Sequence, residues 1–342
     1  MKALFVGLGS VGQRHLRNLK RLRPDAELLA VRTRGRSFEI KDDLTVDHGV
    51  DIVKKYAIRI FGRIEDAAKA MPDFAIVSNP TSLHVETTRS LLERDIPVLL
   101  EKPISDSEEG LDELVELSRK KGVPVMVGYM MRFHPSAERM GGLLKAQAVG
   151  PVHSAVLISH SYVPSWHKYE QPKEFYAGSR SLGGGVVLSE IHELDLLHWY
   201  FGAPRRLWAL GGKLSALDVD VEDTACSLLE FEQGGRRFPV SVSVSFAQTA
   251  PLRRFMVFGE RGRIQWDILA GLIEVKDHAR GLKDVFEVPD FQRNDMFVRE
   301  LEHFLDCLAT KQEPKTALPL VLAGHCTALK IRAAVLPKEV GR

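Results

Sequence analysis

The sequence has few cysteines, little net charge and no long apolar segment, and each scarcity excludes a class of protein. Its three cysteines, Cys226, Cys307 and Cys326, are scattered, so they suit neither a disulfide framework nor a zinc site. A net charge of +2 creates no overall field that would attract nucleic acid. No apolar run approaches the roughly 20 residues that span a bilayer, and a strand starting at Lys2 leaves no room for a signal peptide. We therefore expect a cytoplasmic protein with reduced thiols, no membrane segment and no nucleic-acid partner.

A glycine-rich turn follows the first predicted strand. The apolar run from Ala3 to Val6 is of strand type, Gly7, Gly9 and Gly12 follow as G-x-G-x-x-G, and a helical pattern comes next. This context is typical of dinucleotide binding, because the glycines permit the tight turn, the approach of a pyrophosphate and close helix packing. The alternative is an ordinary glycine-rich turn between a strand and a helix.

The segment after the second predicted strand lacks an acidic residue. An acid at this place would grip the ribose 2'-hydroxyl of NAD, whereas residues 31–37 offer Arg32, Thr33 and Arg34 with a further arginine. A hydroxyl and three guanidiniums suit a 2'-phosphate, so the sequence favours NADP(H) over NAD(H). Some of these arginines could instead be solvated, as we also expect for Arg14 and Arg17 on the first helix.

Strands and helices alternate through the first part of the chain. Strands are predicted over 27–31, 73–80 with a turn at its end, 97–100 and 123–127, which indicates a doubly wound parallel sheet. The turns after them, among them Glu101-Lys102-Pro103, lie at the carboxyl ends of strands, where such sheets bind ligands. A capping box from Ser105 to Glu108 predicts a helix that Gly122 ends. We assign residues 1–123 to a dinucleotide-binding domain.

From about residue 152 the pattern changes to consecutive strands. The segment 240–246 alternates apolar and polar residues, which indicates a strand with one buried face in an open, mostly antiparallel sheet. A helix is predicted over 186–201 after three glycines, and Ser189, His192 and Asp195 share one stripe of it. The fold class is thus α/β plus α+β, with a second domain over 124–342.

The order of these motifs resembles the Gfo/Idh/MocA family of sugar and polyol oxidoreductases over nearly the whole chain. The motifs that carry the resemblance are the glycine turn with His15, Asn79-Pro80 with His84, Glu101-Lys102-Pro103, Gly128-Tyr129 to Pro135, and Gly183-Gly-Gly185 with His192-Glu-Leu-Asp195 and Trp199. The resemblance implies a Rossmann domain, a second domain whose open sheet forms a homodimer or homotetramer interface, and a sugar-type small-molecule substrate. Segments 162–166 and 291–297 resemble a bacterial branch associated with surface-polysaccharide and nonulosonic-acid sugars.

The resemblance also assigns residues. The residues expected to hold the dinucleotide are Gly7, Gly9, Ser10, Val11, Gly12, Arg32, Thr33, Arg34, Asn79, Pro80, His84, Glu101 and Lys102. Those expected near the substrate are Tyr129, Arg132, Trp166, His167, Arg180 and His192. Lys102 and His192 inherit the catalytic roles: His192 would take the hydroxyl proton, and Lys102 would hold that oxygen. No metal is expected.

One position departs from the family pattern. Many members carry an aspartate three or four residues before the histidine, where this chain has Ser189 and Leu188. The carboxylate is then missing, moved, or supplied by Glu190, Glu193 or Asp195, and Asp195 is our first choice as the group that orients His192. The departure keeps a second hypothesis open, namely a non-catalytic nucleotide-binding sensor or regulator.

Overall fold

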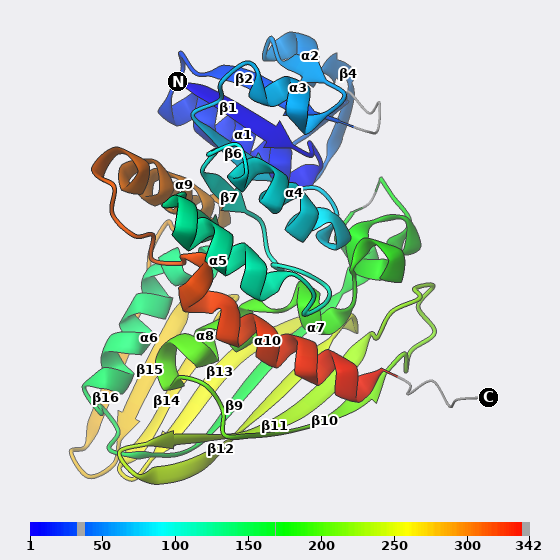
Figure 1. Cartoon of the computed structure of the whole chain (residues 1–342). Coiled ribbons are helices and arrows are strands. Elements are labelled where there is room, and N and C mark those ends of the chain that lie inside the picture. The colour runs from blue at the N-terminus through cyan, green and yellow to red at the C-terminus, as the bar shows by residue number, and fades with distance from the viewer. Residues whose placement is uncertain (33–37, 168, 337–342) are drawn as a thin grey trace.

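The N-terminal part of the chain forms a six-stranded parallel sheet (Figure 1), in a computed structural model that describes residues 1–32, 38–167 and 169–336. The strand order is β5-β2-β1-β6-β7-β8. The strands are β1 (Lys2–Val6), β2 (Glu27–Val31), β5 (Arg59–Phe61), β6 (Phe74–Val77), β7 (Val98–Leu100) and β8 (Val125–Val127). All neighbours pair in parallel, which confirms the doubly wound sheet. Because β8 pairs with β7, the sheet continues beyond the expected domain boundary at residue 123.

Helices cover both faces of this sheet, because its apolar strands are buried on both sides. The elements between its strands are α1 (Ser10–Leu22), the β3 (Phe38–Ile40) and β4 (Val46–Asp51) pair, α2 (Ile52–Lys55), α3 (Ile64–Ala68), the 3₁₀ turn η1 (Thr81–Leu83), α4 (His84–Leu92) and α5 (Leu111–Lys121). The predicted capping box does not start α5: Ser105 Oγ accepts from Ser107 N, and the helix begins after Gly110 in a left-handed conformation. Gly122 ends it as expected.

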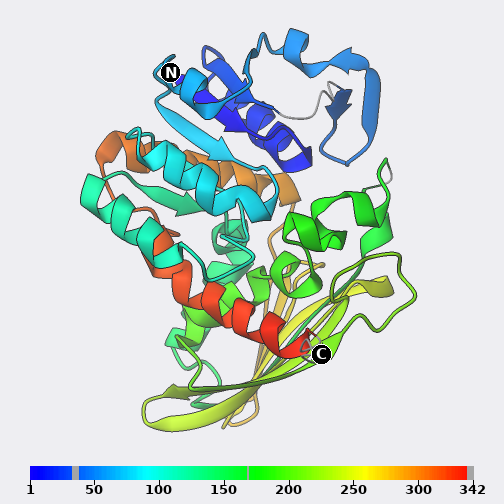
Figure 2. The same ribbon diagram turned by 45° about the vertical axis from the view of Figure 1, so that its right-hand side comes forward.

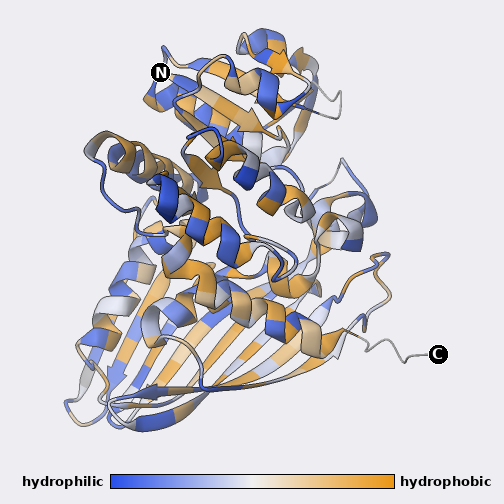
Figure 3. Cartoon of the chain, viewed as in Figure 1, coloured by the Kyte–Doolittle hydropathy of each residue, from blue (hydrophilic) through white to orange (hydrophobic). Residues whose placement is uncertain are grey.

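The second domain is an eight-stranded sheet whose order is β10-β11-β12-β9-β13-β14-β15-β16. Its strands are β9 (Val152–Tyr162), β10 (Arg206–Gly212), β11 (Thr224–Gln233), β12 (Arg236–Ser245), β13 (Ala247–Gly259), β14 (Gly262–Asp267), β15 (Leu272–Asp277) and β16 (Leu282–Phe286). Only the β12–β9 pair is parallel among these neighbours, so the prediction of a mostly antiparallel sheet is confirmed. Hydropathy alternates along many of the strands (Figure 3), as a sheet with one packed and one open face requires.

Helices lie on one side of this sheet (Figure 1). They are α6 (Pro135–Lys145), α7 (Val186–Ser189), α8 (His192–Phe201) and α10 (Leu318–Val335), and the remaining 3₁₀ turns are η2 (Met130–Phe133), η3 (Val163–Ser165), η4 (Pro172–Glu174), η5 (Tyr176–Gly178) and η6 (Arg180–Leu182). The single helix predicted over 186–201 is therefore wrong: it is broken after Ser189, and His192 begins the second piece.

The two C-terminal helices return to the junction of the domains. Helix α9 (Arg293–Thr310) packs against α1, where Phe304 meets Phe74 of β6 edge to face with ring centroids 5.6 Å apart. Helix α10 crosses the packed side of the second sheet (Figures 1 and 2). Among the described helices, α10 has the length and hydropathy of a membrane-crossing segment, although we expected no such segment from the sequence. Within the fold, however, 56% of this helix is buried. A core helix has these same properties.

Candidate active site

A cleft of about 1130 Å³ opens at the carboxyl ends of β1, β2 and β6 and is lined by residues of both domains. In the N-terminal sheet the strand order reverses at β1, the usual place for a dinucleotide. Expected residues that line the cleft are Gly7, Gly9, Ser10, Val11, Arg32, Asn79, Pro80, His84, Glu101, Lys102, Trp166, His167 and His192. Five others stand apart from its lining: Gly12, Tyr129, Arg132, Arg180 and Asp195.

The glycine turn is tightly packed at Gly7 and Gly12 but borders open space at Gly9. A Cβ on Gly7 would lie 2.7 Å from the amide nitrogen of Asn79, and one on Gly12 would lie 2.6 Å from the carbonyl oxygen of Gly7. A Cβ on Gly9, by contrast, would meet nothing within 4 Å, so its backbone borders open space. Helix α1 starts at Ser10 with no side-chain cap, which leaves its first amides available to an anion. This cradle fits the pyrophosphate of a dinucleotide.

Arg32 is the part of the expected 2'-phosphate site that the structure describes. It follows β2 and lines the cleft, and burial lowers the pKa of its guanidinium while Asp51 acts in the opposite sense. Thr33 and Arg34 lie outside the described residues.

Arg14 is buried rather than solvated, which corrects our expectation for this helix face. Its guanidinium donates to Asn294 Oδ1 at 3.0 Å and to the carbonyl oxygen of Asp42 at 2.7 Å, and it stacks over Phe297. The cause is α9, which covers this side of α1 and could not be placed there from sequence periodicity.

His84 connects two turns at the edge of the sheet. Its Nδ1 lies 2.7 Å from the carbonyl oxygen of Pro103, and its Nε2 lies 2.9 Å from that of Asn79. Burial lowers the pKa of His84, so the imidazole is neutral near pH 7 and donates to one carbonyl at a time. The Asn79 amide in turn donates to Thr87 Oγ1 at 2.9 Å. His84 thus braces the turns that border the cleft.

Glu101 belongs to a buried cluster directly beside Lys102. His15 Nε2 lies 2.7 Å from Glu101 Oε1, and the ligand atoms of His15, Glu101 and Glu300 lie within 4.8 Å of one another. Burial and the charge of Glu101 raise the pKa of Glu300 well above its usual range. Glu101 also holds the backbone beside it, because its Oε2 accepts from the amide of Lys102 at 3.2 Å.

Lys102 and His192 come from different domains and meet at the same end of the cleft. Lys102 Nζ donates to the carbonyl oxygen of Ser189 at 2.9 Å. His192 is buried, and neither of its ring nitrogens has a hydrogen-bond partner among the described residues. Burial lowers the pKa of His192 well below its ordinary value, and the charges of Lys102, Arg253 and Arg293 lower it further. The imidazole is therefore neutral and free to accept a proton.

The glycine triplet lets the chain approach its neighbours closely before α7. A Cβ on Gly184 would lie 2.2 Å from the carbonyl oxygen of Tyr176. Gly185 has φ +118°, and a Cβ there would press on the carboxylate of Glu222. Glu222 Oε1 accepts from the amide of Val187 at 3.3 Å, and burial raises the pKa of Glu222 to about 7. These contacts fix the start of α7 and hence the position of Ser189 and α8.

The expectation that Asp195 orients His192 is wrong. Both oxygens of Asp195 accept from Arg132, with Nε at 2.8 Å and Nη2 at 2.7 Å. This ion pair is almost fully buried, so neither the Asp195 carboxylate nor the Arg132 guanidinium is available to a ligand in the cleft. Arg132 is accordingly no substrate ligand. The break in the predicted helix is not the cause, because His192 and Asp195 both lie in α8; Asp195 is instead bound by Arg132, a pairing that the sequence pattern did not reveal.

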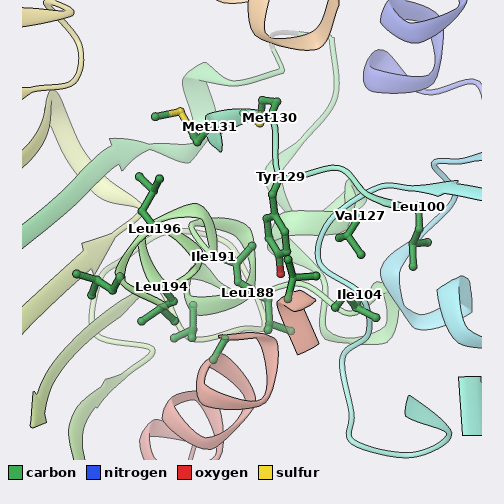
Figure 4. Close-up of a cluster of buried hydrophobic side chains, with 14 of the residues drawn as sticks. Leu100, Ile104, Val127, Tyr129, Met130, Met131, Leu188, Ile191, Leu194 and Leu196 are labelled. Atoms are coloured by element: carbon green, nitrogen blue, oxygen red, sulfur yellow. The ribbon is translucent and has the colours of Figure 1, made fainter. Parts of the chain in front are cut away.

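Tyr129 is also a structural residue in this geometry. It is fully buried between Val127, Ile104, Leu188 and neighbouring apolar side chains (Figure 4). Its ring meets that of His192 edge to face, with centroids 6.1 Å apart. Burial raises the pKa of Tyr129 well above its ordinary value, so it is neutral at physiological pH. We therefore withdraw Tyr129 as a substrate ligand and regard it as packing support for His192.

The aromatic segment after β9 contributes two of its three expected residues. Trp166 and His167 line the cleft, and His167 Nε2 lies 3.5 Å from Ser10 Oγ at the start of α1. Burial lowers the pKa of His167 to about 4. Arg180 instead binds Asp220, through its amide at 2.7 Å to Oδ1 and its Nε at 3.3 Å to the carbonyl oxygen. The expectation that Arg180 contacts substrate is thus not supported by its position.

Glu190 is a cleft carboxylate whose position the sequence did not reveal. Ser159 Oγ donates to its Oε2 at 2.9 Å, and Ser161 Oγ donates to its Oε1 at 3.2 Å. Alternation along β9 places both serines on one face, a signal that could have paired them. Since Glu190 lies in the gap between α7 and α8, it supplies a carboxylate to the cleft without touching His192.

Two arginines also line this end of the cleft, and sequence reasoning missed both. Arg253 on β13 donates from Nε to Glu193 Oε1 at 2.6 Å, while Arg293 is the first residue of α9. They reach the cleft from strands and helices far apart in the chain, so no local pattern could have joined them to His192.

Comparisons with known proteins agree with this geometry. Residues 1–129 match the model of the Gfo/Idh/MocA oxidoreductase family with an NAD-binding Rossmann fold, and residues 138–265 match the family's C-terminal domain. The chain is 26% identical over 330 residues to a scyllo-inositol 2-dehydrogenase (NAD(+)) of Bacillus subtilis, covering 92% of this chain and 88% of that protein. It is 28% identical over 212 residues to a 2,7-anhydro-N-acetylneuraminate hydratase of Mediterraneibacter gnavus, covering 62% and 52%.

Among solved structures, the UDP-N-acetylglucosamine 3-dehydrogenase GnnA of Acidithiobacillus ferrooxidans has the same fold, with a TM-score of 0.75 and 19% identity over 98% of this chain and 97% of that one. The two family matches together span both domains, and the cleft joins their characteristic glycine turn, lysine and histidine. The chain belongs to the Gfo/Idh/MocA family of oxidoreductases.

Proposed function

We propose that this protein transfers a hydride between NAD(P) and a secondary alcohol or carbonyl of a sugar or sugar derivative. Family membership, a cradle shaped for a pyrophosphate, and relatives named as inositol and nucleotide-sugar dehydrogenases support the proposal. The observation that carries it is the meeting of Lys102 and His192 at one end of a cleft that begins at the glycine turn.

The two residues act on one substrate oxygen. NAD(P), when bound, supplies the hydride acceptor or donor. In the oxidation direction, the neutral imidazole of His192 accepts the hydroxyl proton through a ring nitrogen that has no other partner. The Lys102 ammonium, held by the carbonyl oxygen of Ser189, stabilises the negative charge that develops on that oxygen. Trp166 and His167 complete the wall of the cleft.

The cofactor preference is for NADP(H) in this proposal. Arg32 lines the cleft after β2, and the sequence there contains no carboxylate to grip a ribose 2'-hydroxyl. Fluorescence titration with both reduced cofactors tests the preference. Binding of NADH tighter by tenfold, or about 1.4 kcal/mol, would overturn it.

An activity assay tests the proposed reaction. The purified protein is incubated with NAD or NADP and a panel of inositols, hexoses and nucleotide sugars, while absorbance reports formation of the reduced cofactor. Turnover that His192→Ala abolishes supports the proposal. Tight nucleotide binding without turnover of any panel member, in either direction, supports the alternative of a sensor, which the lack of a carboxylate partner for His192 favours.

We further propose a cytoplasmic homodimer or homotetramer that does not bind membranes or nucleic acid. The open face of the second sheet exposes Trp208, Leu210 and Leu228 on neighbouring strands β10 and β11. Exposed apolar side chains gathered on one face indicate an interaction surface. Association of two copies through this face would remove them from water.

A further inference from the structure

The end of the cleft beside His192 gathers three cations. Lys102, Arg253 and Arg293 all line it, and the charge of each acts on His192. Of the carboxylates nearby, Glu101 is paired with His15 and Glu193 with Arg253, while Glu190 accepts from two serines. Lys102 and Arg293 therefore have no carboxylate partner among the described residues, which favours a negatively charged ligand.

The two arginines also have hydrogen-bond donors to spare. Arg253 uses Nε for Glu193, but its Nη2 is buried and has no partner among the described residues. Arg293 is exposed to the cleft and takes part in no ion pair within the described parts of the chain. The neighbouring charge of Arg253 adds to burial in lowering the pKa of Arg293, so the two guanidiniums repel each other as the structure stands. An anion between them would relieve that repulsion and satisfy the free donors.

We propose that the substrate carries a carboxylate or phosphate group, which Arg253 and Arg293 bind while Lys102 and His192 act on a nearby hydroxyl or carbonyl. The inference deepens the proposed function and rests on it for the identity of the reacting group. Guanidiniums bind both anions through paired, charge-assisted hydrogen bonds. Glu190, held by its two serines, is placed to accept hydrogen bonds from sugar hydroxyls, which gives a ligand that is anionic on one side and polyhydroxylated on the other.

Binding to the enzyme loaded with reduced cofactor tests the inference. The probes are D-glucose, D-glucuronate and D-glucose 6-phosphate, with affinity measured by the change in cofactor fluorescence. At least one anionic probe should bind about tenfold or more tightly than glucose, and Arg293→Gln should reduce that ratio by about tenfold. Arg205→Gln is the matched control, because Arg205 is exposed and pairs with Glu232 at the edge of the second sheet. The two anions distinguish a carboxylate from a phosphate subsite.

A second variant covers the risk that one arginine is needed for folding. Removal of Arg253 would leave Glu193 buried without its partner, so Arg253→Lys, which keeps the charge but loses the paired geometry, is used there. Arg253→Lys should lower the ratio of anionic-probe affinity to glucose affinity, and thermal unfolding checks that the variant is folded. Equal binding of all probes, binding of none, or a ratio unchanged in Arg293→Gln overturns the inference. Turnover of neutral sugars with no preference for acids overturns it while the proposed function stands. Preferential acid binding without turnover of any member of the substrate panel, in either direction, supports the anion site and refutes the proposed function.

Discussion

Glu222 should make the stability of this protein depend on pH near neutrality. Its carboxyl group is 1% exposed beneath Gly185, and burial raises its pKa to about 7 against an ordinary 4.5, although Arg332 acts in the opposite sense. The folded state therefore holds the proton more tightly than the unfolded state does. Below about pH 4.5 both states are protonated and folding carries no penalty; the penalty grows as the pH rises through 4.5 to 7 and stays constant above.

The magnitude follows from the two pKa values. At about 1.36 kcal/mol for each tenfold change in proton affinity, the change from 4.5 to about 7 corresponds to about 3 kcal/mol. Glu222→Gln removes the charge and keeps an oxygen that can accept from the Val187 amide. Since a small part of the penalty is already present at pH 5, the substitution should raise the free energy of unfolding by about 2.5 kcal/mol more at about pH 8 than at about pH 5.

Urea unfolding at a series of pH values, followed by tryptophan fluorescence, measures this difference. Glu313→Gln serves as the control, because Glu313 is exposed and the same chemical change there should give no such pH dependence. If the effect of Glu222→Gln on the free energy of unfolding is the same at both ends of the pH range, Glu222 ionises as readily folded as unfolded, and the reasoning from its burial fails.

Other substitutions test the site and the open sheet face. His192→Ala and Lys102→Met should each lower kcat, measured by cofactor absorbance, by about 10²- to 10⁴-fold with cofactor affinity little changed. Near-normal turnover by the His192→Ala variant would mean that another base accepts the proton. Gly9→Ala should weaken cofactor binding without lowering Tm, since its methyl group enters the open space of the turn; an unaltered Kd would contradict that placement. Leu210→Lys should dissociate the proposed homo-oligomer in light scattering, and a wild-type monomer at micromolar concentration would refute the assembly.

Local signals predicted most of the fold. The glycine turn, the buried strand runs and the stop at Gly122 depend on backbone sterics and on periodicity within a short window, and the structure has them where the sequence placed them. The break between α7 and α8 was missed, because residues 186–201 have helix-forming composition, whereas the contacts at the break are tertiary: Lys102 donates to the carbonyl oxygen of Ser189, and Ser159 and Ser161 donate to Glu190.

Only those residues of the candidate site that belong to sequence motifs could be predicted. Lys102 and His192 could be named from the resemblance, but the partners of each side chain depend on packing between distant segments. Asp195 thus pairs with Arg132 rather than with His192. Arg253 and Arg293 line the cleft from β13 and α9, and no sequence motif predicted that they would.

The return of α9 to the first sheet affects how the nucleotide-binding half can be made. Leu301, Phe304 and Leu305 share one apolar cluster with Phe5 and Phe74, so that core is complete only after the ribosome has synthesised most of the chain. Until then, the face of the sheet that these side chains cover remains open to chaperones or to other nascent chains. A gene fragment that ends with β8 would therefore encode all six strands and still lack part of their core. Recombination that exchanges the cofactor domain between relatives must carry α9 with it.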